Sequence, residues 1–153
     1  MSEPIVHASF CIERTMATPP ARVFAAFADP ALKSKWFHGP DTWAPTDLAF
    51  DFREGGHETV AGAVPGVWSS RFEADYHVIE PDARIVYSYV MYHDDVRLSV
   101  SVTTVELDPV DDGRATRMVF AEQGAYFEDG EAAHASREEG TIGILNTLEA
   151  TLR

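Results

Sequence analysis

About eighty residues in the middle of this 153-residue chain alternate apolar and polar side chains, segment after segment, with turn residues between the segments. Side chains along a strand point alternately to two faces, so this alternation predicts half-buried strands. Short links such as Pro81-Asp82 and Asp112-Gly113 predict hairpins and therefore antiparallel pairing. The predicted strands have the sequences LAFDF, HETVAGAV, VWSSRFEADYHVI, RIVYSYVMYH, VRLSVSVTTVEL and ATRMVFAEQG.

Two adjacent glycines, Gly55 and Gly56, separate the first two of these strands in the stretch AFDFREGGHETV. A phosphate-binding loop needs a lysine followed by Ser or Thr at the start of a helix, whereas these glycines lie between strands. We therefore predict a hairpin turn, in which glycine supplies positive φ values. Asp51, His57 and Glu58 lack the fixed spacing of metal ligands and are predicted to form a solvated charged edge.

In the predicted strand VRLSVSVTTVEL, the apolar side chains move from one parity to the other. Leu98, Val100 and Val102 share one parity, and Val105 and Leu107 share the other. Such a change predicts a β-bulge near Thr103-Thr104, which would help the sheet to curl.

Helices are predicted on both sides of this run of strands. Residues 5–16 alternate like a further strand, in which Cys11 is expected to be a buried, inert thiol. TPPARVFAAFADP and ALKSKWF predict two short helices, and residues 131–153 predict one long helix. Its apolar stripe recurs at spacings of four, three and four through Thr141, Leu145, Leu148 and Leu152, but its N-terminal part carries His134 and Arg137.

These elements predict an α+β fold within a single domain covering residues 1–153. About six or seven antiparallel strands form a curved sheet that, with two short helices, grips the long C-terminal helix. A curved sheet need not be filled by one helix, so a pocket is expected between the two.

The net charge of the chain makes some classes of binding partner unfavourable. Twelve basic and 25 acidic side chains give a net charge of -13, which repels nucleic-acid phosphates and anionic membrane surfaces. No apolar run is long enough to cross a membrane, and the start of the chain lacks the pattern of a signal peptide. We therefore expect a cytoplasmic protein that binds neither nucleic acid nor membrane.

Several strings resemble the START-like (SRPBCC) superfamily, which has the helix-grip fold. They are ARVFAAFADPALKSKWFHGP, DFREGGHE, RIVYSYVMY, RATRMVFAEQGAYFEDG and REEGTIGILNTLEATL. The chain is most similar to bacterial single-domain proteins that resemble the C-terminal domain of the activator of the heat-shock protein 90 ATPase. This resemblance implies the fold but not the chemistry, because the superfamily includes carriers, receptors, cyclases and co-chaperone domains. Relatives often carry Trp where this chain has Thr141, and the smaller side chain would enlarge the pocket or open it to water.

Aromatic and other side chains are predicted to line the pocket. Glu122 shares its parity with Met118 and Phe120, so it is expected to face inward, either as an acid–base group or in an ion pair with Arg137 or another cation. His134 is expected on the inward face of the last helix near Arg137. The predicted pocket residues are Trp36, Phe50, Phe52, Trp68, Phe72, Tyr87, Tyr89, Met91, Met118, Phe120, Glu122, His134, Arg137, Thr141, Ile144 and Leu145.

The leading hypothesis is non-catalytic binding of a small, mostly apolar or aromatic molecule in this pocket. A co-chaperone related to activators of the heat-shock protein 90 ATPase is the second hypothesis, and a cyclase- or hydrolase-type enzyme using Glu122 with His134 or Arg137 is the third. No nucleophile triad, reactive cysteine, histidine metal motif or cofactor motif is present, so no catalytic residue, metal or cofactor is assigned. A chaperone partner and a homodimer are both left open.

Overall fold

The structure, a computed structural model, describes residues 3–39 and 43–153. A strand and two short helices come first, followed by six strands and a long helix. In order they are β1 (Val6–Met16), α1 (Pro20–Ala28), α2 (Pro30–Lys33), β2 (Ala44–Phe50), β3 (His57–Val64), β4 (Trp68–Glu80), β5 (Arg84–His93), β6 (Val96–Val110), β7 (Ala115–Tyr126) and α3 (Gly130–Thr151).

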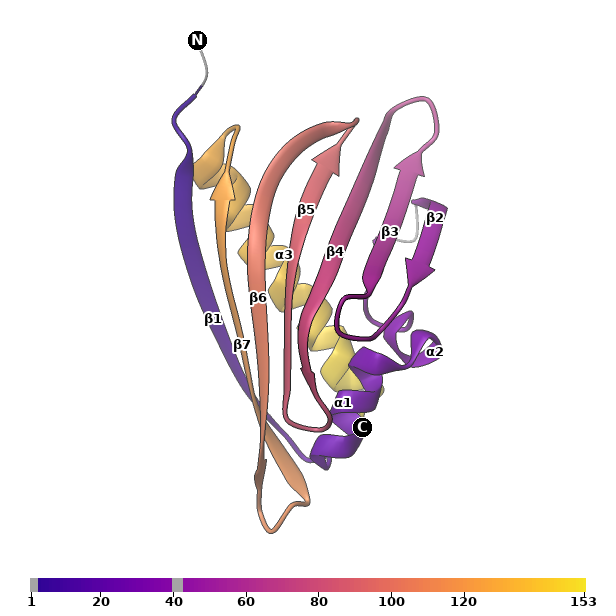
Figure 1. Cartoon of the computed structure of the whole chain (residues 1–153), viewed down its shortest axis with the longest axis vertical. Helices are drawn as coiled ribbons and strands as arrows, with labels where there is room; N and C mark the ends of the chain where they lie inside the picture. The colour runs from indigo at the N-terminus through magenta and orange to yellow at the C-terminus, as the bar shows by residue number, and fades with distance from the viewer. Residues whose placement is uncertain (1–2, 40–42) are drawn as a thin grey trace.

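All seven strands form one antiparallel sheet in the order β1-β7-β6-β5-β4-β3-β2. The long strands curve, and α3 crosses behind them in the view of Figure 1, with α1 and α2 near its C-terminal end. One face of the sheet therefore grips α3, and no helix of the described residues covers the other face. This arrangement confirms the predicted α+β helix-grip fold. No helix in the described ranges is long and apolar enough to span a membrane.

The glycine pair forms the predicted turn between β2 and β3. Gly55 adopts a φ of 81°, and its N–H donates to the carbonyl of Tyr76 at 2.9 Å. Gly56 is needed for space, because a Cβ there would lie 2.0 Å from the carbonyl oxygen of Asp51.

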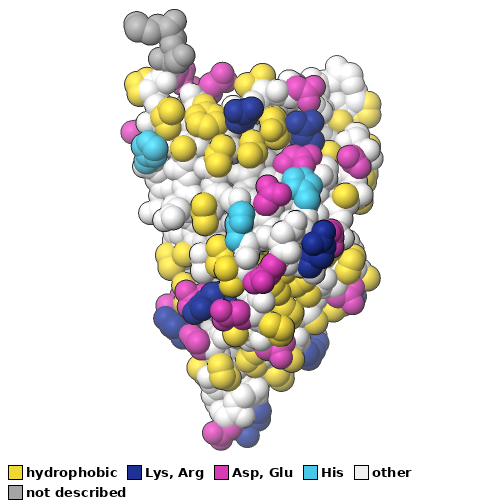
Figure 2. Space-filling view, in the orientation of Figure 1, with side chains coloured by type: hydrophobic (Ala, Val, Ile, Leu, Met, Phe, Trp, Pro, Cys, Tyr) yellow, Lys and Arg dark blue, Asp and Glu magenta, His cyan; other side chains and the backbone are white. Residues whose placement is uncertain are grey.

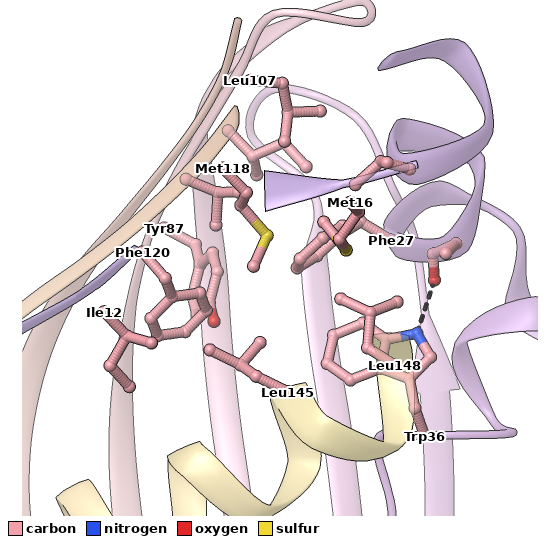
Figure 3. Close-up of a cluster of buried hydrophobic side chains, with 14 of the residues drawn as sticks. Ile12, Met16, Phe27, Trp36, Tyr87, Leu107, Met118, Phe120, Leu145 and Leu148 are labelled. Carbon is pink, nitrogen blue, oxygen red and sulfur yellow. Dashed lines mark hydrogen bonds between the residues drawn. The ribbon is translucent and has the colours of Figure 1, made fainter. Parts of the chain in front are cut away.

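The apolar core lies between the sheet and the C-terminal half of α3. Leu145 from α3 points toward Tyr87 and Phe120 from the sheet, and Leu148 lies beside Trp36 (Figure 3). The α1–α2 segment closes the end of this core, where Trp36 donates from Nε1 to the carbonyl of Ala26 at 2.9 Å. Burial of these large apolar side chains is the main favourable contribution to the packing of α3 against the sheet.

The predicted bulge near Thr103-Thr104 is wrong. Residues from Ser99 to Val110 pair with β7 without interruption, and the shift in the β5–β6 pairing lies between Met91 and Tyr92. Ser99, Ser101, Thr103, Val105 and Leu107 are all buried, so the inward parity never changes. What changes along β6 is the chemistry of the inward face, from polar at Ser99, Ser101 and Thr103 to apolar at Val105 and Leu107, while Val100 and Val102 face outward.

Cys11 was also predicted wrongly. It is exposed, because it alternates with the buried Phe10 and Ile12 and therefore lies on the outer face of β1. A small apolar side chain on a half-exposed strand gives no sequence signal for its face.

Candidate functional site

A buried polar cluster lies where β5, β6 and β7 face the N-terminal half of α3. Glu122, which is 5% exposed, lies at its centre. The Tyr89 hydroxyl donates to Glu122 Oε2 at 2.7 Å, and Thr103 Oγ1 donates to Oε1 at 2.9 Å. Thr103 and Glu122 are direct cross-strand partners in the β6–β7 register, which brings their side chains together.

Arg137 brings a positive charge into this cluster from α3. Its guanidinium donates to the Tyr89 hydroxyl at 2.9 Å and to Ser99 Oγ at 3.0 Å. The guanidinium carbon also lies 5.4 Å from the centre of the Tyr126 ring. Tyr89 thus bridges Arg137 and Glu122, and within the described residues these two groups form no direct ion pair. The predicted direct pair is therefore replaced by a phenol-mediated link.

The environment changes the proton affinity of the cluster. Burial raises the pKa of the Glu122 carboxyl above its ordinary value, although the hydrogen bond from Tyr89 and the charge of Arg137 oppose this effect. Burial also raises the pKa of the Tyr89 hydroxyl, so Tyr89 remains a neutral donor at physiological pH. The cluster therefore holds one carboxyl and one guanidinium around a neutral phenol.

Two buried polar atoms of this region have no hydrogen-bond partner within the described residues: Ser101 Oγ and His134 Nδ1. Ser101 is 1% exposed and lies on β6 between Ser99 and Thr103, both of which are bonded in the cluster. Gly124 pairs with Ser101 across the sheet, and a Cβ at Gly124 would lie 2.5 Å from Ser101 Oγ. The His134 ring lies beside the rings of Phe10 and Tyr126, with centroids at 6.0 and 5.6 Å. Buried polar groups are nearly always bonded, so these two atoms indicate a site for an additional hydrogen-bonding group.

The raised pKa of Glu122 predicts a specific pH dependence. The folded protein keeps this proton to higher pH than the unfolded chain, so the associated stability is complete below about 4.5 and is lost as pH rises through the folded pKa. The free energy of unfolding of wild type minus that of Glu122→Gln should therefore fall as pH rises from about 4 to about 8. Urea denaturation of both proteins at each pH measures this difference in the free energy of unfolding, and Tyr89, Arg137 and His134 are unchanged in both. A difference that stays constant or rises would contradict the assignment.

A second buried polar cluster lies at the other end of the sheet, under β2 and β3. Lys33 Nζ lies 2.6 Å from Glu58 Oε1 and 3.0 Å from the Tyr76 hydroxyl, which itself donates to Glu58 at 2.8 Å. The Phe37 and Phe50 rings surround the ammonium, with centroids at 4.5 and 4.7 Å. Burial lowers the pKa of Lys33, and the charge of Glu58 opposes that effect. This cluster fixes α2 to the sheet.

Glu58 does not belong to a solvated edge, as the sequence predicted. His57 and Glu58 are adjacent on β3, so their side chains point to opposite faces of the sheet. His57 faces outward, where it contacts Glu73 and Asp75, and Glu58 faces the core. Asp51 stays exposed and bonds Arg53 at 2.8 Å.

Most of the predicted lining residues pack against one another. Phe72, for example, contacts the rings of Phe37 and Tyr89, with centroids at 5.0 and 4.7 Å. Trp68 lies outside the core cluster, stacked on His93 and edge-on to Trp43. The residues within the core are Trp36, Phe72, Tyr87, Tyr89, Met118, Phe120 and Leu145, and those packed partly buried against it are Phe50, Phe52, Met91 and Ile144. The apolar cavity stays a prediction, because these aromatic rings themselves occupy much of the space between the sheet and α3.

The structure does bring together the polar residues predicted for the site. Glu122 and Arg137 meet at Tyr89, and His134 lies one helical turn before Arg137 on the same helix. Thr141 is buried, but its hydroxyl donates to the Arg137 carbonyl at 2.8 Å and so is satisfied within α3. Sequence reasoning missed Ser99, Ser101 and Thr103, because the alternate positions on this part of β6 hold the more apolar Val100 and Val102. The inward parity of Glu122 and the pairing of β6 with β7 could have identified them.

Comparisons with known proteins agree with the fold. The model of a family described as "Activator of Hsp90 ATPase homolog 1-like protein" matches residues 17–153. No curated protein matches the sequence.

Solved bacterial structures are similar over nearly the whole chain. The Mll3558 protein from Rhizobium loti is 42% identical, with 97% of this chain and 99% of that chain covered and a TM-score of 0.87. An uncharacterized protein from Rhizobium leguminosarum is 38% identical, with 97% and 96% covered and a TM-score of 0.88. Protein CV1439 from Chromobacterium violaceum is 26% identical, with 94% and 96% covered and a TM-score of 0.71. None of these names states a ligand, a substrate or a partner.

Proposed function

This chain belongs to the family of Activator of Hsp90 ATPase homolog 1-like proteins, and we propose that it binds a small molecule between its sheet and α3 without transforming it. The molecule has an apolar or aromatic body and one polar group. The body contacts the rings near the N-terminal half of α3, and the polar group reaches Ser101. The observation that carries this proposal is the fully buried Ser101 hydroxyl opposite a glycine, which neighbours the Tyr126 hydroxyl but makes no hydrogen bond of ordinary geometry within the described residues.

The polar group of the ligand is uncharged. Glu122 and Arg137 already supply one charge of each sign on the two sides of the Tyr89 hydroxyl. A charged ligand would enter this buried site without a free partner, which is strongly unfavourable. The Ser101 hydroxyl can serve a group that both donates and accepts, such as a carboxamide or a hydroxyl.

Binding is favoured over catalysis by the occupancy of the carboxylate. Tyr89 donates to one oxygen of Glu122 and Thr103 to the other. A general base needs a free lone pair aimed at the reacting proton, and these two donors compete for that position. Glu122 and Arg137, two of the groups of the enzyme hypothesis, do converge, but they converge on the Tyr89 hydroxyl and are both bonded to it.

Two conservative substitutions on β6 should have opposite effects. Ser101→Ala removes an unsatisfied buried hydroxyl and should raise the free energy of unfolding of the ligand-free protein by about 1 kcal/mol. Thr103→Val removes a donor to Glu122 and should lower it by about 1–2 kcal/mol. Both positions are buried on the same face, so each variant serves as the control for the other in urea denaturation. A loss of stability in Ser101→Ala would show that its hydroxyl is already satisfied.

Native mass spectrometry of freshly purified protein tests the proposed function. We expect a discrete extra mass that is released on denaturation as a small uncharged organic compound. Gly124→Ala, whose Cβ would lie 2.5 Å from Ser101 Oγ and so crowd that hydroxyl, should be purified without that mass, while Gly143→Ala, where a Cβ meets nothing within 4 Å, should keep it. An extra mass retained equally by both variants would place the ligand elsewhere.

The family match supports a second candidate, a co-chaperone acting on an ATPase of the heat-shock protein 90 type. The acidic surface implied by a net charge of -13 would contact a basic region of that partner. Stimulation of ATP turnover by a bacterial homologue of that chaperone is the expected result. Unchanged turnover at saturating concentration of this protein would eliminate this candidate and leave the ligand proposal intact.

A further inference from the structure

An uncharged area covers the middle of the outer face of the sheet. The strand registers place outward residues of β1, β7, β6 and β5 in three adjacent rows. The rows run from His7 across to Val90, from Ser9 across to Ser88 and from Cys11 across to Val86. We call these twelve positions the outer array. None of them is Asp, Glu, Lys or Arg, although these types make up 24% of the chain.

Charged side chains border the outer array sharply. Glu73 and Asp75 on β4 pair with Val90 and Ser88 at its edge. The next row beyond Cys11 holds Glu13 on β1 and Glu106 on β6. Figure 2 shows this face, where a mostly white and yellow area beside the charged groups over β4 contains neither blue nor magenta side chains. Exposed, charge-free areas of this kind mark interaction sites.

The outer array combines projecting side chains with a hollow. Val100 and Val102 are 40% and 37% exposed on β6, far more than an inward-facing valine would be. Beside them, a hollow of about 430 Å³ is lined by His7, Ala8, Ser9, Gln123 and Gly124. Gln123 is the cross-strand partner of Val102, so the hollow and the valines are direct neighbours.

We propose that the outer array is the interface of a homodimer in which two copies pack their sheets face to face. A two-fold axis through the array places the projecting valines of each copy over the hollow of the other, so one patch supplies both halves of the fit. The charge of the chain favours the same contact, because two copies with a net charge of -13 repel wherever charged surfaces meet. The outer array is where they approach without facing like charges.

The size of the array predicts a weak dimer. Four strands about 4.8 Å apart and three rows about 6.8 Å apart span about 400 Å² in each copy. A total of about 800 Å² lies below the roughly 1,200–2,000 Å² of stable specific interfaces and in the range of weak, transient ones, so we expect a dissociation constant of tens of micromolar. Salt should strengthen the dimer, because it screens the repulsion between the two acidic copies.

Sedimentation velocity tests this dimer with two matched variants. Wild type should shift from monomer to dimer between about 5 and about 500 µM, at a lower concentration in about 0.5 M than in about 0.05 M NaCl. Val102→Glu should stay monomeric throughout. Val67→Glu adds the same charge at a 68% exposed valine outside the array and should dimerise like wild type. Ser101→Ala, which alters only the inner site, should also dimerise like wild type.

Two results would overturn the proposal. Wild type that remains monomeric at every concentration and salt would show that the array receives another protein or none. Equal weakening by Val102→Glu and Val67→Glu would show that the added charge acts wherever it is placed. Because the array and the ligand site lie on opposite faces of the sheet, neither result bears on the proposed ligand.

Discussion

Glu58→Ala is expected to lower the free energy of unfolding by about 3–5 kcal/mol, the largest effect of any single substitution considered for this protein. The change leaves the Lys33 ammonium buried among Phe37, Phe50 and Tyr76 without its carboxylate. It also removes the acceptor of the Tyr76 hydroxyl. Urea denaturation followed by tryptophan fluorescence measures the loss.

The control replaces the whole cluster by apolar side chains of similar shape. The triple variant Lys33→Met, Glu58→Leu, Tyr76→Phe leaves no buried charge or unsatisfied hydroxyl, so it should recover most of the stability that Glu58→Ala loses. Stability lost equally in both variants would show that packing, and not charge pairing, dominates at this site. A loss below about 1 kcal/mol in Glu58→Ala would show that the ammonium reaches water.

Arg137→Met should lower the free energy of unfolding by about 2–4 kcal/mol at neutral pH. The guanidinium donates to Tyr89 and Ser99, and its charge opposes the unfavourable burial of the Glu122 carboxylate. Met keeps much of the stem packing between the sheet and α3 while removing both the charge and the donors. The pKa of Glu122 should rise further in this variant.

The double variant Arg137→Met, Glu122→Gln separates these causes. If the buried carboxylate dominates, the added Glu122→Gln substitution should recover a large part of the stability lost in Arg137→Met. A double-mutant cycle gives the coupling energy directly. Additive effects would show that the two residues act independently, in contradiction to the link through Tyr89.

The fold could be predicted because local patterns agree with it along nearly the whole chain. The alternating segments correspond to β1 to β7, and the glycine pair corresponds to the β2–β3 turn. The stripe that includes Leu145 and Leu148 corresponds to the buried face of α3. The similarity to bacterial members of the family is likewise confirmed by the match over residues 17–153.

The site was harder to predict because period-two alternation does not say which parity faces inward. On β6 the valines were the more apolar set, yet Ser99, Ser101 and Thr103 are the buried ones. Those polar residues are stable there because Glu122 and Arg137, distant in sequence, bond Thr103 and Ser99. Lys33 gave no signal either, because its partner Glu58 is 25 positions away and only the tertiary fold places it beside α2.

A nitrogen–proton correlation NMR titration tests the proposed ligand site at Ser101 at individual residues. The probe is 2-naphthamide, which has an aromatic body and an uncharged group that both donates and accepts hydrogen bonds. We expect shift changes at the amides of Ser101, Gly124 and Arg137, and at least tenfold weaker binding of 2-naphthoate, whose carboxylate has no free cation in the site. Changes confined to His7, Ser9 and Gln123 on the outer face, or none at about 1 mM probe, would contradict the proposed site.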